Sequence, residues 1–241
     1  MLLYQTMSLE ERLHEVMADF RELYKDRLGK LFERNRRMFA VAKKFPVKIT
    51  CPFKSERGNQ WKVTLLARSK KEAKHHGYMP LLKYHTSHGV GFLYPKLLDG
   101  FNMDVIVHDF TPHLVSRYKE RFLQVQEDGE HLLENFMVDM MMYNMPFHVA
   151  YEEKHKCYVA FVEDGIFLSN QCDPYRYVIW KTFVSEKMLF DDQAEAFEMF
   201  SGFRERYLAH IAHTGQYAKG CVHLGDDGLP LIFGKHDRSL G

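Results

Sequence analysis

Three ionisable side chains, His113, Arg117 and Glu120, stand at helical spacing within the segment 111–122. At about 100° per residue they share one narrow sector of the helix, away from the apolar stripe of the same segment. An imidazole, a guanidinium and a carboxylate could therefore address one ligand. We predict a functional site here, with Arg121 at its margin.

Cleavage of RNA through its 2′-hydroxyl requires a base, an acid and a fixed cation beside the phosphate. Histidine and glutamate exchange protons near neutral pH, and arginine binds phosphate oxygens in a bidentate manner. The three side chains could supply these functions as candidate catalytic residues. The alternative is an ordinary solvated helix face, in which Glu120 pairs with Arg117 three residues before it.

The pattern also resembles a known group of enzymes. An H-x-x-x-R helix, followed by a second helix and an antiparallel sheet with a Thr or Ser on a late strand, is similar to the superfamily of barnase, EndoU, the colicin tRNases and RelE-type toxins. The resemblance covers about residues 111–185. The residues that carry it are His113, Arg117, Lys181, Thr182 and Ser185.

This resemblance implies a toxin-like hydrolase that cleaves RNA without a metal ion. His113 would be the acid or base, Arg117 and Lys181 would bind phosphate, and Thr182 or Ser185 would donate a hydrogen bond. The first hundred residues have no counterpart in the minimal fold of that superfamily.

The charge of the chain is divided unevenly between its two parts. Residues 1–100 have a net charge of +10 and residues 101–241 a net charge of −9, so the total is only +1. Such a division indicates either a surface that faces nucleic acid or a basic arm that docks on the acidic part of the same chain, and the second alternative is slightly favoured.

Two basic clusters could line a surface that follows a phosphate backbone, with Trp61, Tyr78 or Tyr84 for base stacking. The alternative is that the lysine cluster is a solvated loop. The candidate nucleic-acid-binding residues are Arg34, Arg36, Arg37, Lys70, Lys71, Lys74 and Arg121.

A long amphipathic helix is predicted at residues 8–42. The segment opens with the capping box Ser8-Leu9-Glu10-Glu11, shows an interruption expected at Gly29, and is followed by Pro46. Its apolar stripe suggests the main rival function, a non-catalytic interaction protein that binds a partner, or its own copy in a homodimer, through this helix.

The whole pattern predicts a single α+β domain. We expect a basic helical arm at 1–44, a small sheet at 45–110, then a helix pair, an antiparallel meander and a closing helix within 111–213, and a tail at 214–241. The expected strands lie at 47–51, 60–68, 82–85, 90–94, 103–109, 147–151, 157–163, 166–169 and 175–184. The expected later helices lie at 111–126, between Gly129 and Pro146, and at 192–213.

Several function classes lack support in the sequence. No apolar run reaches the ~18 residues of a membrane span, the four cysteines lie far apart, and we expect a cytoplasmic protein with reduced thiols. His85 and His88 are read as strand and loop residues rather than metal ligands. Gly89-Val90-Gly91 fits no phosphate-binding loop, so neither a metal nor a cofactor is expected.

Overall fold

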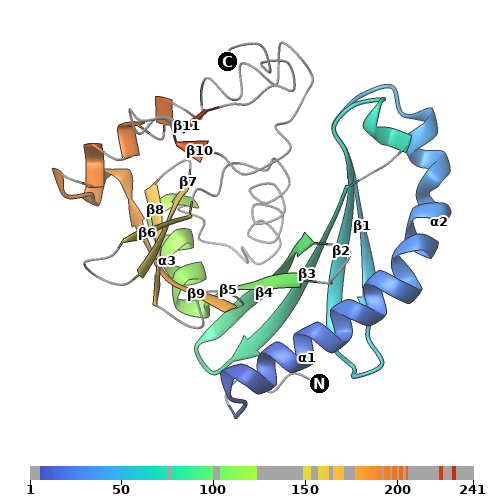
Figure 1. The fold of residues 1–241 in the computed structure, drawn as a ribbon, viewed down its shortest axis with the longest axis horizontal. Coiled ribbons are helices and arrows are strands. Elements are labelled where there is room, and N and C mark those ends of the chain that lie inside the picture. The colour runs from blue at the N-terminus through green and yellow to red at the C-terminus, as the bar shows by residue number, and fades with distance from the viewer. Residues whose placement is uncertain are drawn as a thin grey trace, which may run out of the picture.

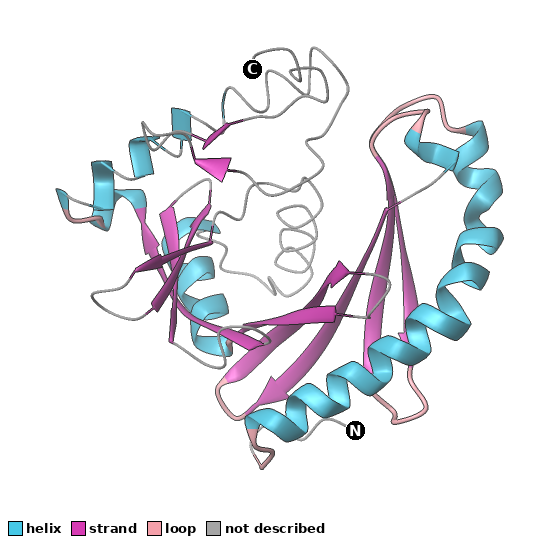
Figure 2. Cartoon of the chain, in the orientation of Figure 1, coloured by secondary structure: helices cyan, strands magenta, loops and turns pink. Residues whose placement is uncertain are grey.

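The structure is a computed structural model, and it describes about two thirds of the chain. The described residues are 6–74, 77–99, 104–123, 149–152, 157–162, 165–170, 177–191, 193–195, 197–199, 201–202, 205, 223–224 and 230–231. Within them the chain is an α+β protein with a long N-terminal helix and a large sheet, as the sequence predicts (Figure 2).

One nine-stranded sheet runs through the molecule in the order β1-β2-β3-β4-β5-β9-β8-β7-β6 (Figure 1). All neighbours are antiparallel except β5 and β9, which pair in parallel. The predicted small sheet and meander are therefore one sheet joined at this pair. The strands are β1 (Val47–Lys54), β2 (Gln60–Ala67), β3 (Gly77–Thr86), β4 (Gly89–Asp99), β5 (Asp104–Phe110), β6 (Val149–Glu152), β7 (Cys157–Val162), β8 (Gly165–Asn170) and β9 (Tyr177–Ser185).

The long helix comprises α1 (Leu9–Glu22), a π-helical turn η1 (Leu23–Arg27) and α2 (Leu28–Val41). Its predicted capping box is confirmed. The Ser8 hydroxyl accepts a bond of 3.3 Å from the Glu11 N–H, and the Ser8 N–H donates one of 2.7 Å to the Glu11 carboxylate. The helix ends at Val41, where Ala42 turns extended, five residues before Pro46.

The interruption of this helix occurs at η1, so the prediction that Gly29 would interrupt it is wrong. The buried positions explain why. At about 100° per residue, Leu28 and Phe39 would lie roughly 100° away from Val16 and Phe20 on an unbroken α-helix. A π turn accommodates one extra residue. It therefore restores a common buried side for all four residues.

That buried side packs on the sheet. Val16, Phe20 and Leu23 are fully buried in a core with Trp61 and Val63 of β2. The helix lies mainly over β1–β4 in the basic part (Figure 1), and the core beneath it also includes Val107 of β5 and Ile179 of β9. The expected arm does dock on its own chain, but through this apolar core rather than by charge on the acidic part. The contact is apolar, and each fully buried large side chain contributes about 1.5–3 kcal/mol.

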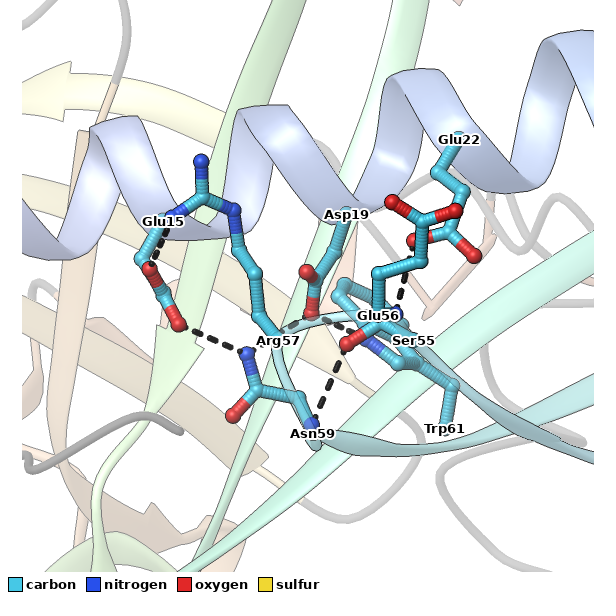
Figure 3. A network of polar contacts seen from close by, with 8 residues as sticks. All are labelled: Glu15, Asp19, Glu22, Ser55, Glu56, Arg57, Asn59 and Trp61. Carbon is cyan, nitrogen blue, oxygen red and sulfur yellow. Dashed lines mark hydrogen bonds and ion pairs between the residues drawn. The ribbon is translucent and has the colours of Figure 1, made fainter.

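A polar network attaches α1 to the turn between β1 and β2 (Figure 3). Buried Asp19 accepts bonds of 2.7 Å from Asn59 Nδ2 and 2.8 Å from Trp61 Nε1. Glu15 forms an ion pair with Arg57 at 3.1 Å. Burial raises the pKa of Asp19, and the bonds from Trp61 and Asn59 oppose that shift. The network fixes the helix axially on the hairpin.

The opposite face of the sheet packs on a short helix, α3 (Pro112–Tyr118), which continues as a π turn, η3 (Lys119–Leu123). Leu114 and Tyr118 of α3 share a core with Trp180 and Phe183 of β9. The predicted helix end at 126 and the second helix of the pair lie outside the described residues. The described residues from 191 to 205 are helical, and two short strands, β10 (His223–Leu224) and β11 (Pro230–Leu231), pair within the predicted tail.

Candidate nucleic-acid interface

A row of cations runs along the solvent side of α2. Lys30, Arg34 and Arg37 are exposed and follow one another at intervals of four and three residues. Such intervals place them on one line, with an axial rise of about 6 and 4.5 Å between neighbours. The line lies opposite buried Leu28 and Phe39, so it forms the outer ridge of the helix.

The connection between β2 and β3 adds three more cations. Lys70, Lys71 and Lys74 are exposed, and the 3-10 turn η2 (Glu72–Lys74) lies against α2. The carboxylate in this segment is used locally, because Glu72 Oε2 accepts a bond of 3.0 Å from the Arg68 N–H. The packing therefore brings together two basic segments that are separated by about 30 residues in sequence.

We call these six residues, Lys30, Arg34, Arg37, Lys70, Lys71 and Lys74, the basic face. Among the described residues, no carboxylate forms an ion pair with any of them. The predicted Arg36 differs, since it pairs with Glu33 at 3.5 Å. Exposed cations that form no ion pair attract a polyanion.

The aromatic residues expected to stack on bases do not line this face. Trp61 and Tyr84 have exposed fractions of 2% and 4%, and both belong to the core under the long helix. Their predicted stacking role is therefore wrong. Tyr78 is half-buried, with ring centroids of Tyr24 and Phe32 at 6.3 and 6.4 Å. Burial raises the pKa of Tyr78 well above its ordinary value.

The second candidate site lies where α3 meets β9. Thr111 is the N-cap, as predicted, and its Oγ1 accepts a bond from the Leu114 N–H at 3.4 Å. The same hydroxyl donates at 2.9 Å to the Trp180 carbonyl, which also accepts the Thr111 N–H at 3.2 Å. His113 is exposed two residues after Thr111, and Lys181 is exposed one residue after Trp180. The bonds between Thr111 and Trp180 therefore hold together the two segments that carry His113 and Lys181.

Two of the predicted catalytic residues are engaged with each other. Arg117 Nη1 and Glu120 Oε2 are 3.3 Å apart, and the Ser116 hydroxyl donates to the Glu120 carboxylate at 2.8 Å. Arg121 Nη1 donates to the Phe183 carbonyl at 2.5 Å. The guanidinium of Arg121 therefore anchors α3 to β9 and is directed toward the strand backbone.

A bulge in β9 decides where Thr182 points. In the pairing with β8, Leu168 is opposite Thr182 and Ser169 is opposite Trp180, so Lys181 is the extra residue. Trp180 and Phe183 both face α3. Because side chains alternate along a strand, Thr182 faces the other side of the sheet. The structure thus brings Arg117 to Glu120 but leaves Thr182 away from the face that carries α3. Among the described residues, no hydrogen bond joins Thr182 to His113.

No protein-family model matches this chain, and no similar curated protein or solved structure was found. The resemblance of residues 111–185 to ribonucleases therefore stays a prediction.

Other site classes receive no support from the described part of the chain. It contains no group of three His, Cys, Asp or Glu side chains arranged to hold a metal ion. His85 is on β3 and His88 is in the following turn, while His75 and His76 lie outside the described residues. No described helix is long and apolar enough to cross a membrane.

The residue that the sequence reasoning did not select is Lys30. Its spacing to Arg34 and Arg37 could have shown it, because intervals of four and three residues put side chains on one helix line. The position of the 70–74 connection beside α2 had no such local signal. It depends on how β2 and β3 pair.

Proposed function

We propose that this chain binds RNA through the basic face. The observation that carries the proposal is the contact of η2 with α2, which places two clusters of exposed cations beside each other. The rival function required an exposed apolar stripe on helix 8–42. That stripe is buried against the sheet, which favours RNA over a partner docked on the stripe.

Phosphate contacts account for most of the affinity in this proposal. Each neutralised phosphate releases condensed counterions, so binding weakens with salt, by a slope of about 0.7 per phosphate on single strands. Without exposed aromatic platforms on the basic face, affinity depends weakly on base sequence.

The test is fluorescence anisotropy with single-stranded RNA, duplex RNA, duplex DNA and heparin over a range of salt. Arg34→Glu with Arg37→Glu, and Lys70→Glu with Lys71→Glu, should each weaken RNA binding at least about tenfold and lower the salt slope on single-stranded RNA by about 0.7 per lost contact. Lys54→Glu and Lys187→Glu, at exposed cations elsewhere, are the matched controls. Equal loss in the controls, or binding to heparin as tight as to RNA, would contradict the proposal.

A second candidate is cleavage of the bound RNA at the α3–β9 junction, with His113 as acid or base and Lys181 as the phosphate-binding cation. The bonds from Thr111 to the Trp180 carbonyl favour it, because they hold the two segments together. Arg117, paired with Glu120, would have to exchange that partner for phosphate. Thr182 has no part in this version of the site.

Cleavage is tested with structured and single-stranded RNA in EDTA. His113→Ala and Lys181→Ala should each lower the rate about 100-fold or more, since acid–base catalysis contributes on the order of 10²–10⁴. Lys54→Ala, at an exposed cation outside this junction, is the control. Native protein that binds RNA and leaves it intact would remove the cleavage candidate and leave the binding proposal standing.

A further inference from the structure

A second surface of the molecule exposes large apolar side chains beside carboxylates. Met188 and Phe190 precede the helical residues 191–205, and Met199 lies on them. Phe190 has an exposed fraction of 75%, the largest among the exposed apolar side chains of the described residues. Buried Phe197 attaches the helical segment to the protein, and exposed Met199, about 200° from it around the helix, lies on the outer side. Grouped exposed apolar residues of this kind mark interaction surfaces.

The carboxylates around them form a row. Asp191, Glu195 and Glu198 are exposed and follow one another at intervals of four and three residues, with Met199 next in the chain. At helical geometry they lie on one line of the outer side. We call the surface made by these six residues, Met188, Phe190, Asp191, Glu195, Glu198 and Met199, the acidic face.

The outer ridge of α2 carries the same pattern with the opposite charge. Lys30, Arg34 and Arg37 have intervals of four and three residues, and Met38 is next in the chain. Met38 and Val41 have exposed fractions of 55% and 66%. Three cations and three carboxylates with equal axial spacing can meet pair by pair along two facing helices, with apolar side chains beside them.

The two surfaces cannot meet within one molecule. The residues of α2 cover the β1 end of the sheet, whereas the residues of the acidic face follow β9 in the other half (Figure 1). In the view of Figure 1, α2 and the orange helical segment lie on opposite sides of the molecule. The complementary charges therefore favour contact between the acidic face of one copy and the α2 ridge of a second copy.

We propose that this chain self-associates, with the acidic face of one copy on the outer ridge of α2 of another. The contact goes beyond RNA binding and does not depend on it, although both use Arg34 and Arg37. Because the two surfaces differ, the assembly is either a two-fold dimer with two equivalent contacts or a head-to-tail chain. Self-association then competes with RNA for α2.

The experiment measures the mass of the full-length, nuclease-treated protein by analytical ultracentrifugation. The native chain should associate at low ionic strength and become monomeric in about 1 M NaCl, where the Debye length is ~3 Å. One variant carries Arg34→Glu and Arg37→Glu, the other Glu195→Arg and Glu198→Arg. Each variant alone should be monomeric, because one of its two surfaces has the wrong charge.

Mixing the two variants gives the decisive result. The first retains an intact acidic face and the second an intact α2, so an equimolar mixture should form a 1:1 complex, and a chain with all four changes should self-associate again. Lys54→Glu, at an exposed cation outside both surfaces, should leave association unchanged. Circular dichroism and unfolding midpoints verify that the variants fold.

A native chain that stays monomeric at low salt would overturn the proposal, as would two variants that fail to bind each other. The outcomes also separate this proposal from the proposed function. Glu195→Arg with Glu198→Arg abolishes association and leaves RNA affinity at least native, whereas Arg34→Glu with Arg37→Glu weakens both. For Arg34→Glu with Arg37→Glu, loss of association with full RNA binding would contradict the RNA proposal, and loss of RNA binding with full association would contradict the self-association proposal.

Discussion

The indole Nε1–H of Trp180 donates a hydrogen bond of 3.2 Å to Nδ1 of His108. Their rings are stacked with centroids 6.1 Å apart. His108 lies on β5 and Trp180 on β9, so this bond spans the parallel pair that joins the two halves of the sheet. Burial lowers the pKa of His108 to about 3, and the charge of Lys96 adds to the effect. The folded protein therefore holds a neutral imidazole.

Stability should fall with acid because of His108. Its pKa in the unfolded chain is about 6.5, so below that pH the unfolded state binds a proton that the folded state does not. The contribution is fully present above pH 6.5 and is lost by about 1.4 kcal/mol per pH unit as the pH falls toward 3. His108→Asn retains an acceptor for Trp180 and should reduce this slope between about pH 6.5 and 5, as measured by urea unfolding. Equal slopes for both proteins would contradict the assignment.

Two glycine-to-alanine changes should have opposite effects. A Cβ at Gly91 would overlap the ring of Tyr84, whose hydroxyl donates at 2.6 Å to buried Asp109. Gly91→Ala should cost about 2–4 kcal/mol, because it displaces that ring and weakens a buried bond. Gly29→Ala meets nothing within 4 Å on an exposed helix side and should add about 0.8 kcal/mol. Thermal unfolding of both variants checks the pair.

Because of the π turn, two single-residue deletions in the long helix should have different effects on stability. Removal of exposed Asp26 should convert η1 into α-helix and keep both buried sides on the sheet, at a cost below about 1 kcal/mol. Removal of exposed Glu33 should rotate the following residues by about 100° and expose Phe39, at a cost of about 3–5 kcal/mol. Urea unfolding of the two deletion variants measures the difference. Similar losses of stability in the two variants would mean that η1 does not determine which side of α2 is buried.

Substitution of Arg121 should lower stability without changing RNA affinity, whereas substitution of Arg34 should lower RNA affinity without changing stability. Arg121→Ala removes the bond to the Phe183 carbonyl and should lower stability by about 1–3 kcal/mol with RNA affinity unchanged. Arg34→Ala, at an exposed position, should leave stability within about 0.5 kcal/mol and weaken RNA binding. Unfolding and anisotropy on the same two variants test this. A drop in RNA affinity for Arg121→Ala would indicate that Arg121 contributes to RNA binding.

The sequence by itself determined the local elements of this protein. Ser8 and Glu11 fix the start of α1, Thr111 and Pro112 fix the start of α3, and the strand positions follow alternating apolar residues. These signals are readable because capping and side-chain alternation depend on residues a few positions apart. The spacing of Phe20 and Leu28 also contains the extra residue of η1, although glycine content alone predicts an interruption at Gly29 instead.

Only the tertiary structure decided which elements meet. The parallel pairing of β5 with β9 joins residues about 70 positions apart, and the helix that covers β2 buries Trp61 and Tyr84. The bulge at Lys181 turns Thr182 to the opposite face, and the pairing of β2 with β3 brings Lys70 beside α2. Such contacts are set by strand register and by burial of apolar surface over the whole chain, and neither leaves a local pattern in the sequence.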